Sequence, residues 1–165
     1  MNWITKIIKA GEKIKTAIRE RATKADIAKS DWTSCCRGPI LKKDLETNLW
    51  VCPDCNKHHY ISPTNRFNLM FGKDGWKKIE SPQPLPDPYK WEDTKKYVDR
   101  LKDAKKITGQ DNAILSCEAK INNIDVVVSA VDFKFIGGSI SMAEGENVLA
   151  AVQIAINKKC PYIFV

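Results

Sequence analysis

Apolar residues recur along the chain at different spacings, and each spacing predicts a different kind of element. The first 30 residues place isoleucines on one helix face, among eight Lys/Arg residues and three acids. We expect a basic amphipathic helix or arm over 1–30, which lies on a membrane surface, acts as a mitochondrial targeting helix or docks on the rest of the chain. The isoleucines are Ile4, Ile7, Ile8, Ile14 and Ile18.

The middle of the chain predicts two helices joined by an extended connector. Ser62 and Pro63 form an N-cap and first-turn pair, and Gly72 stops that helix. Alternate prolines then make 62–91 a helix followed by a semi-rigid connector. A second helix is expected over about 92–108, ending at Gly109. The connector prolines are Pro82, Pro84, Pro86 and Pro88, and the apolar face of the second helix comprises Tyr97, Leu101, Ala104 and Ile107 or Val98.

The last third reads as strand, strand, helix and strand. The runs "AILSCEAKI" and "IDVVVSAVDFKFI" are separated by Asn122-Asn123, which suits a hairpin turn. Ser141 and Glu144 fit a capping box for the following helix, and Lys158 and Lys159 suit its C-terminus. The run "PYIFV" then starts a strand with no visible partner, so we expect a truncated chain. The fold class is α/β, as an α+β mixture.

Composition excludes several classes of protein. Hydrophobic residues make up 43% and charged residues 28% of the 165, as in a soluble domain. No apolar run approaches the roughly 18 residues that cross a bilayer, and charges at Lys6, Lys9 and Glu12 exclude a secretory signal. The six cysteines are therefore expected to be thiols or metal ligands in a reducing, cytoplasmic location. The net charge of +7 favours anionic partners.

Four of the cysteines have the spacing of a zinc ribbon over 31–61. Cys52 and Cys55 form a CPxC knuckle, and 15 residues separate them from Cys36. Ribbons of two knuckles have gaps of roughly 15–20 residues, and Zn²⁺ prefers four tetrahedral ligands. We expect the intervening "ILKKDLETNLWV" to form the two short arms of the ribbon.

The first knuckle lacks a spacer, because Cys35 and Cys36 are adjacent. Neighbouring side chains of an extended chain point to opposite faces, so joint chelation needs a sharp turn. Three outcomes stay open: both thiols bind, or one binds while His58, His59 or an acid completes the set, or the site is weak or empty. The two cysteines outside the ribbon, Cys117 and Cys160, are expected to be small buried hydrophobes.

Several motifs occur in the order found in one known family. They are Trp32-Thr33, the cysteine cluster, "LETNLWVCPDCNKHH", "TNRFNLMF", "KKYVDRLKDAKKITGQDNAI" and "DFKFIGGSISMAEGE". Over about 30–165 the chain resembles the β subunit of bacterial-type acetyl-coenzyme A carboxylase, the carboxyltransferase component. The resemblance implies a zinc ribbon followed by a crotonase-like fold of β-β-α units, whose first part would be 92–165.

The resemblance also implies an activity and partners. The family transfers a carboxyl group from carboxybiotin to acetyl-CoA, which gives malonyl-CoA for fatty acid synthesis. The β subunit pairs with an α subunit, usually as α2β2, and works with the biotin carboxyl carrier protein and biotin carboxylase. Its structural Zn²⁺ would be held here by Cys35, Cys36, Cys52 and Cys55, although the family pattern WTxCxxCG has a spacer that this chain lacks.

Gly137-Gly138 matches the family's "GGS" element. A turn without side chains at a helix N-terminus can present N–H groups to an anion, so both glycines are candidate substrate-lining residues. The alternative is a tight turn that only glycine fits. No residue of the chain is assigned as catalytic, and the truncated chain is expected to be inactive alone.

Two other functions compete with the carboxyltransferase. A basic zinc-ribbon module that binds nucleic acid fits the charge and the cysteines, although Trp50 and Tyr60 are the only aromatic residues close to the knuckles after Trp32. A non-catalytic assembly subunit fits a truncated or decayed copy.

Overall fold

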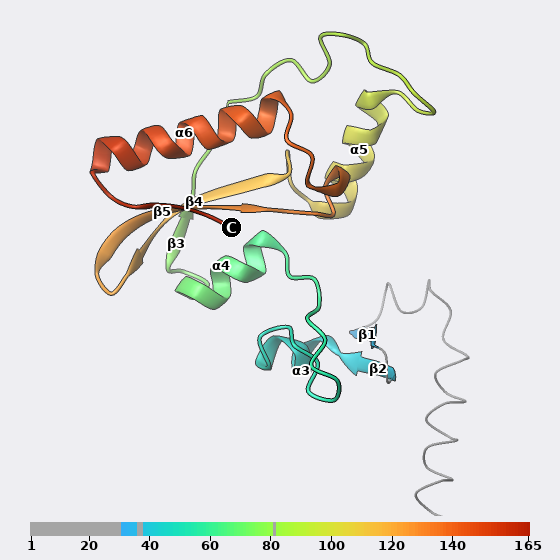
Figure 1. The fold of residues 1–165 in the computed structure, drawn as a ribbon, viewed down its shortest axis with the longest axis vertical. Coiled ribbons are helices and arrows are strands. Elements are labelled where there is room, and N and C mark those ends of the chain that lie inside the picture. The colour runs from blue at the N-terminus through green and yellow to red at the C-terminus, as the bar shows by residue number, and fades with distance from the viewer. Residues whose placement is uncertain (1–30, 36–37, 81) are drawn as a thin grey trace, which may run out of the picture. The chain divides into compact units, whose positions relative to one another are not determined.

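The computed structural model describes residues 31–35, 38–80 and 82–165. The chain divides into two compact units, with the division between Ile61 and Ser62 (Figure 1). The helix expected over 1–30 lies outside the described residues. None of the described helices is long and apolar enough to cross a membrane.

The described part of the first unit contains a short hairpin and one helix. Strand β1 (Trp32–Cys35) pairs antiparallel with β2 (Gly38–Leu41), and α3 (Lys42–Thr47) follows directly. The expectation that 40–51 forms two short ribbon arms is therefore wrong over 42–47, where the chain is helical. The helix forms there because it buries Leu45 completely, and the Trp50 N–H closes the turn on the Leu45 carbonyl at 2.6 Å.

The second unit begins with α4 (Pro63–Phe71), and its predicted ends are confirmed. The Ser62 hydroxyl accepts the Asn65 N–H at 3.3 Å, and Pro63 occupies the first turn. Gly72 ends the helix with φ of 81°. The fully buried Phe67 of this helix packs against the sheet.

A four-stranded sheet forms the centre of the second unit, in the order β3-β4-β5-β6. The predicted hairpin is confirmed: β4 and β5 pair antiparallel, and Asn122 and Asn123 turn the chain with φ of 49° and 66°. The last strand pairs in parallel with β5, so the expectation that it has no partner is wrong. Its partner lies more than thirty residues earlier in the chain, beyond the reach of local patterns. The strands are β3 (Trp76–Lys78), β4 (Ile114–Ile121), β5 (Ile124–Val131) and β6 (Tyr162–Phe164).

Alternate residues of β4 and β5 point to opposite faces of the sheet, and each face is covered by a different helix (Figure 1). Phe67 of α4 packs against one face, together with Cys117 and Val128. Helix α6 (Met142–Lys158) covers the other face, where Ala151 and Ala155 pack against Val127. Its predicted capping box between Ser141 and Glu144 is confirmed.

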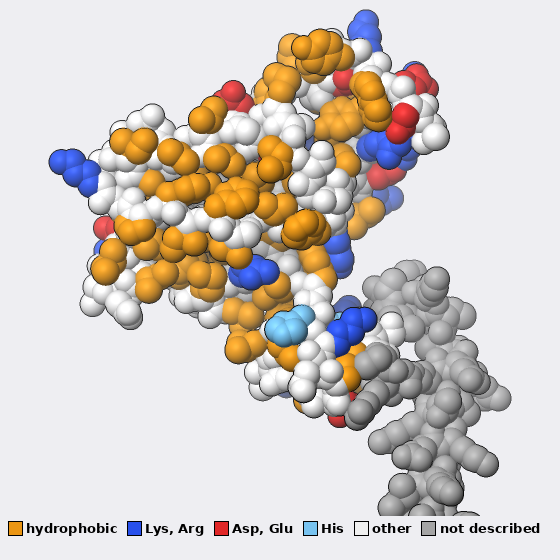
Figure 2. Space-filling model, in the orientation of Figure 1, with side chains coloured by type: hydrophobic (Ala, Val, Ile, Leu, Met, Phe, Trp, Pro, Cys, Tyr) orange, Lys and Arg blue, Asp and Glu red, His pale blue; other side chains and the backbone are white. Residues whose placement is uncertain are grey.

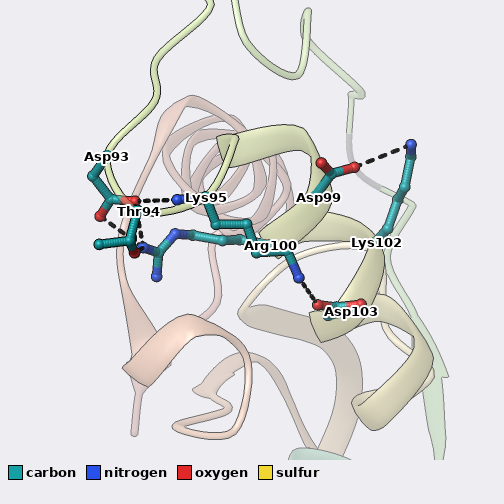
Figure 3. Close-up of polar contacts among 7 residues, drawn as sticks. All are labelled: Asp93, Thr94, Lys95, Asp99, Arg100, Lys102 and Asp103. Carbon is teal, nitrogen blue, oxygen red and sulfur yellow. Dashed lines mark hydrogen bonds and ion pairs between the residues drawn. The ribbon is translucent and has the colours of Figure 1, made fainter.

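Helix α5 (Tyr97–Thr108) begins five residues later than predicted and ends, as expected, at a left-handed Gly109. Its start is delayed because the Asp93 carboxylate accepts the Lys95 N–H at 3.0 Å and binds the Arg100 guanidinium, which holds 93–95 in a turn (Figure 3). The hydrogen bond from Arg100, followed by that from Lys95, lowers the pKa of Asp93. Lys95 also pairs with Asp103.

The apolar side of α5 is narrower than predicted. Ala104 is buried, and Leu101 packs against the cluster that contains Ala104 and Phe135, whereas Ile107 is 70% exposed. Figure 2 shows that apolar side chains also reach the surface of the second unit. The exposed ones on α6 and β6 include Met142, Leu149, Ile156 and Phe164.

Candidate metal centre and glycine turn

Three cysteine thiols converge in the first unit. The sulfurs of Cys35, Cys52 and Cys55 all lie within 4.8 Å of one another. The Cys35 and Cys55 sulfurs are 3.3 Å apart although they are 20 residues apart in the chain. The spacing therefore identified three residues that the fold brings together.

Local hydrogen bonds shape the second knuckle. The Cys52 N–H donates to the Lys57 carbonyl, and the Asn56 N–H donates to the Cys52 carbonyl, each at 2.9 Å. Asn56 takes the left-handed conformation that such a tight turn needs, with φ of 58°. These bonds turn Cys52 and Cys55 to the same side, and Cys52 is only 1% exposed.

The fourth corner of the cluster is not supplied by the residues that the structure describes. No histidine, aspartate or glutamate among them joins the three thiols. His58 lies opposite Val51 in a β-bridge. His59 has a buried Nε2 that lacks a hydrogen-bond partner in the described part of the chain, and burial followed by the charge of Lys57 lowers its pKa. Cys36 lies outside the described residues.

The three thiols fit a tetrahedral metal. Thiolates bound to one Zn²⁺ at about 2.3 Å lie about 3.8 Å from each other. The observed separations bracket that value, from 3.3 Å for one pair to an upper limit of 4.8 Å. The cluster can therefore hold a metal ion without rearrangement of the second knuckle.

Gly137 and Gly138 lie in a 3-10 turn, Ile136–Gly138, between β5 and α6. Ser139 and Ile140 separate this turn from the N-cap Ser141, so the glycines are not the N-terminus of α6 itself. Three consecutive residues have left-handed φ values, 47° at Ile136, 67° at Gly137 and 76° at Gly138.

The two glycines have different roles in the turn. A Cβ on Gly138 would lie 3.1 Å from both the Phe133 and the Val131 side chains, whereas a Cβ on Gly137 would meet nothing within 4 Å. The Gly138 N–H donates to the Phe135 carbonyl at 2.9 Å, and the Ser139 N–H donates to the Ile136 carbonyl at 3.2 Å. Neither bond uses the Gly137 N–H, which makes Gly137 the better candidate to contact a ligand.

A cavity of about 500 Å³ adjoins this turn within the second unit. The wall nearest the turn is formed by Ser139 and Ser141, and α5 contributes Tyr97 and Leu101. Such a volume suits a small-molecule ligand. Sequence reasoning missed the cavity because 83–91, α5 and the start of α6 meet only in the folded unit.

The two described thiols outside the cluster, Cys117 and Cys160, do not join it. Cys117 is fully buried, as predicted, and burial raises its pKa to about 12, so it stays protonated and inert. Cys160 is half-buried against Ala155 and its neighbours.

Three known proteins that are similar to this chain carry the same name. The chain is 55% identical over 163 residues to the acetyl-coenzyme A carboxylase carboxyl transferase subunit beta of Pelagibacter ubique. This alignment covers 99% of this chain and 53% of that protein. The proteins of the same name from Beijerinckia indica and Bartonella quintana are 34% and 37% identical, again over 99% of this chain and 55% and 52% of their own lengths. No protein-family model matches.

These matches confirm the resemblance that the motifs indicated. The chain spans about half the length of the curated relatives it matches. The names of the relatives do not favour the nucleic-acid alternative.

Proposed function

We propose that this chain is part of the β subunit of an acetyl-CoA carboxylase carboxyltransferase. The observation that carries the proposal is the alignment over 99% of the chain at 55% identity with a protein of that name. The subunit would help to transfer a carboxyl group from carboxybiotin to acetyl-CoA, with malonyl-CoA as the product, in the cytoplasm. The second unit would be the beginning of a crotonase-like domain.

The glycine turn suits the chemistry of this transfer. The acetyl α-carbon loses a proton and attacks the carboxyl carbon, the bond from that carbon to the biotin nitrogen breaks, and the released biotin nitrogen gains a proton, so that biotin and malonyl-CoA are formed. Negative charge develops on the thioester oxygen as the proton leaves. A backbone N–H aimed at that oxygen contributes about 3 kcal/mol to the transition state. We assign that donor to Gly137 and the shape of the turn to Gly138, with the adjoining cavity available to the substrate.

The metal would have a structural role. Cys35, Cys52 and Cys55 would hold Zn²⁺, and Cys36 would complete a four-thiolate set. Such a set leaves no open position for substrate, so the ion would stabilise the first unit and take no part in the transfer. The α subunit, the biotin carboxyl carrier protein and biotin carboxylase are the expected partners, in an α2β2 assembly of the two carboxyltransferase subunits.

The experiment is to reconstitute the transfer. The complete reading frame that contains this chain is expressed with an α subunit and supplied with acetyl-CoA and carboxylated biotin carrier. We expect malonyl-CoA. Its absence above the background without the β subunit would refute the proposal.

A matched pair of glycine variants tests the turn. Gly137→Ala and Gly109→Ala both add a methyl group into open space at a left-handed residue, with φ of 67° and 70°. The backbone cost is therefore the same, about 1 kcal/mol. Alanine keeps the backbone N–H, but its methyl group occupies the open space beside that N–H and hinders the close approach of a ligand. We therefore expect Gly137→Ala to lower malonyl-CoA formation by at least about tenfold and Gly109→Ala to leave it unchanged. Equal activities would remove Gly137 from the site.

A further inference from the structure

The glycine turn is strained as well as tight. Ile136 is β-branched, yet it adopts φ of 47°, a conformation that such residues rarely take. A strained backbone persists only where the surrounding structure holds it in place. The bonds inside the turn, from Gly138 and Ser139, are local and do not explain what holds it to the rest of the unit.

Glu144 ties the downstream end of the turn to the sheet. Its side chain is among the largest that are fully buried, with the residue 2% exposed. One carboxylate oxygen accepts the Ser141 N–H at 2.9 Å and the Ser141 hydroxyl. The other accepts the Ala113 N–H at 2.8 Å, 31 residues away at the start of β4. A capping box needs only the bond from the Ser141 N–H to Glu144. The bond from the Ala113 N–H is therefore an additional tertiary contact.

Asp132 ties the upstream end to the same place. It is 1% exposed, and its carboxylate accepts the Lys134 N–H at 2.8 Å and the Gln110 amide at 3.0 Å. Its own N–H donates to the Ala113 carbonyl at 2.7 Å.

Both polar groups of Ala113 are thus used by the two ends of one loop. The Ala113 N–H donates to the Glu144 carboxylate, and the Ala113 carbonyl accepts the backbone N–H of Asp132. Ala113 itself is fully buried against Phe135 and Ala104. One side-chain bond and one backbone bond to Ala113 therefore fix the two ends of the segment 132–144.

We propose that Asp132 and Glu144 are positioning residues for the strained Ile136–Gly138 turn. The Asp132 carboxylate fixes the upstream end through Lys134 and Gln110, and the Glu144 carboxylate fixes the downstream end through Ser141 and Ala113. A buried carboxylate is tolerated only when its hydrogen bonds are made, so each of these residues fixes the donors around it. The catalytic consequence rests on the proposed function: if the turn presents an N–H to the thioester oxygen, the two carboxylates set where that N–H points.

The test compares Glu144→Gln with Glu146→Gln in this chain. Both variants remove one negative charge from the first two turns of α6, but Glu146 is exposed. An amide at 144 can accept only at its oxygen, so one of the two groups of donors loses its acceptor. We expect hydrogen exchange at the Gly138 and Ser139 amides to accelerate by at least about tenfold in Glu144→Gln, while exchange at the β5 amides stays unchanged. Glu146→Gln should change neither.

Two further variants keep the proposal testable if Glu144→Gln does not fold. Asp132→Asn should show the same local acceleration, and Ser141→Ala, which removes only one donor to Glu144, a smaller one. Exchange that stays unchanged in these variants, or that rises equally in β5, would overturn the positioning role.

Kinetics separate positioning from stability in the complete β subunit assembled with an α subunit. We expect Glu144→Gln to lower kcat by at least about tenfold while KM for acetyl-CoA stays within about twofold, because the misplaced N–H matters only in the transition state. Loss of kcat/KM entirely through KM would contradict this. If the unmodified enzyme forms no malonyl-CoA, the proposed function fails, and the exchange result still decides whether the carboxylates hold the turn.

Discussion

The described parts of the two compact units bury very different sets of apolar side chains. In the described part of the first unit, the buried hydrophobic residues are Leu45 and Cys52, and Cys52 is a proposed metal ligand. The second unit has apolar clusters on both faces of its sheet, with Phe67 on one and Ala151 on the other. A segment of about 30 residues cannot be stabilised by so small a core, and chains of that size use metals or disulfides.

The same chain therefore relies on two sources of stability. Metal–thiolate bonds should hold the first unit, and side-chain packing should hold the second.

Removal of the metal should have the largest effect. Binding of structural zinc contributes about 10–16 kcal/mol to small zinc domains, so chelation at pH 7 should unfold the first unit. The amide signals of Leu45 and Trp50 should collapse in NMR spectra, while those of Val127 and Val128 persist. Loss of the β5 signals under the same conditions would show that the units do not fold independently.

Cysteine variants identify the ligands behind that effect. Elemental analysis should find about one zinc per chain, and Cys36→Ser should reduce it as much as Cys52→Ser does. Cys160→Ser is the matched control, because its half-buried thiol lies outside the cluster. Zinc that survives both Cys35→Ser and Cys36→Ser would exclude the four-thiolate site and leave the carboxyltransferase proposal intact.

Truncation of the packing in the second unit should have the next largest effect. Phe67→Ala removes a fully buried ring that packs against Trp76 at a centroid distance of 5.3 Å. It should lower the free energy of unfolding of this unit by about 3–5 kcal/mol. Leu69→Ala on the exposed side of α4, where the residue is 44% exposed, should cost below about 1 kcal/mol. Urea unfolding monitored by the second unit measures both, and similar costs would contradict the assigned core.

Local signals were sufficient to predict the elements whose ends are set by their own residues. The caps at Ser62, Gly72 and Gly109 and the Asn122-Asn123 turn act within a few residues, so they could be read directly. The start of α5 was misplaced because the Asp93 side chain competes with the helix for backbone donors.

Contacts between distant residues could not be read in the same way. The pairing of β6 with β5 and the bond from Glu144 to Ala113 join segments more than thirty residues apart. At the metal cluster, spacing was sufficient for Cys35, Cys52 and Cys55, because ligand sets leave a sequence signature. The strained Ile136 leaves none, since nothing in its side chain favours the left-handed conformation.

Alkaline pH should destabilise the second unit through Cys117. Burial raises the pKa of this thiol from 9.0 to about 12. Between those values the unfolded chain releases a proton that the folded chain keeps, so stability falls as pH rises from 9 toward 12. At pH 11 the loss attributable to Cys117 should be about 2.5 kcal/mol.

The variant Cys117→Ala isolates this contribution from other groups that titrate at high pH. The difference in unfolding free energy between the unmodified chain and the variant, measured in urea at pH 7 and pH 11, should shrink by that amount. Cys160→Ala should leave the pH dependence of the unmodified chain in place. Parallel pH curves for the chain and Cys117→Ala would show that the thiol ionises in the folded state.

Removal of the Ser62 N-cap should have the smallest effect on stability, and it directly tests whether the two units are independent. Ser62 is the first residue of the second unit, and its hydroxyl caps α4 through the Asn65 N–H. Ser62→Ala should lower the stability of that unit by about 1 kcal/mol, and Thr64→Ala, at an exposed position two residues further on, by less. The cost should be the same in a Cys52→Ser background, since effects on independent units add to within about 0.5 kcal/mol. If Ser62→Ala lowered the free energy of unfolding more in the Cys52→Ser background than in the unmodified chain, the stability of α4 would depend on the first unit.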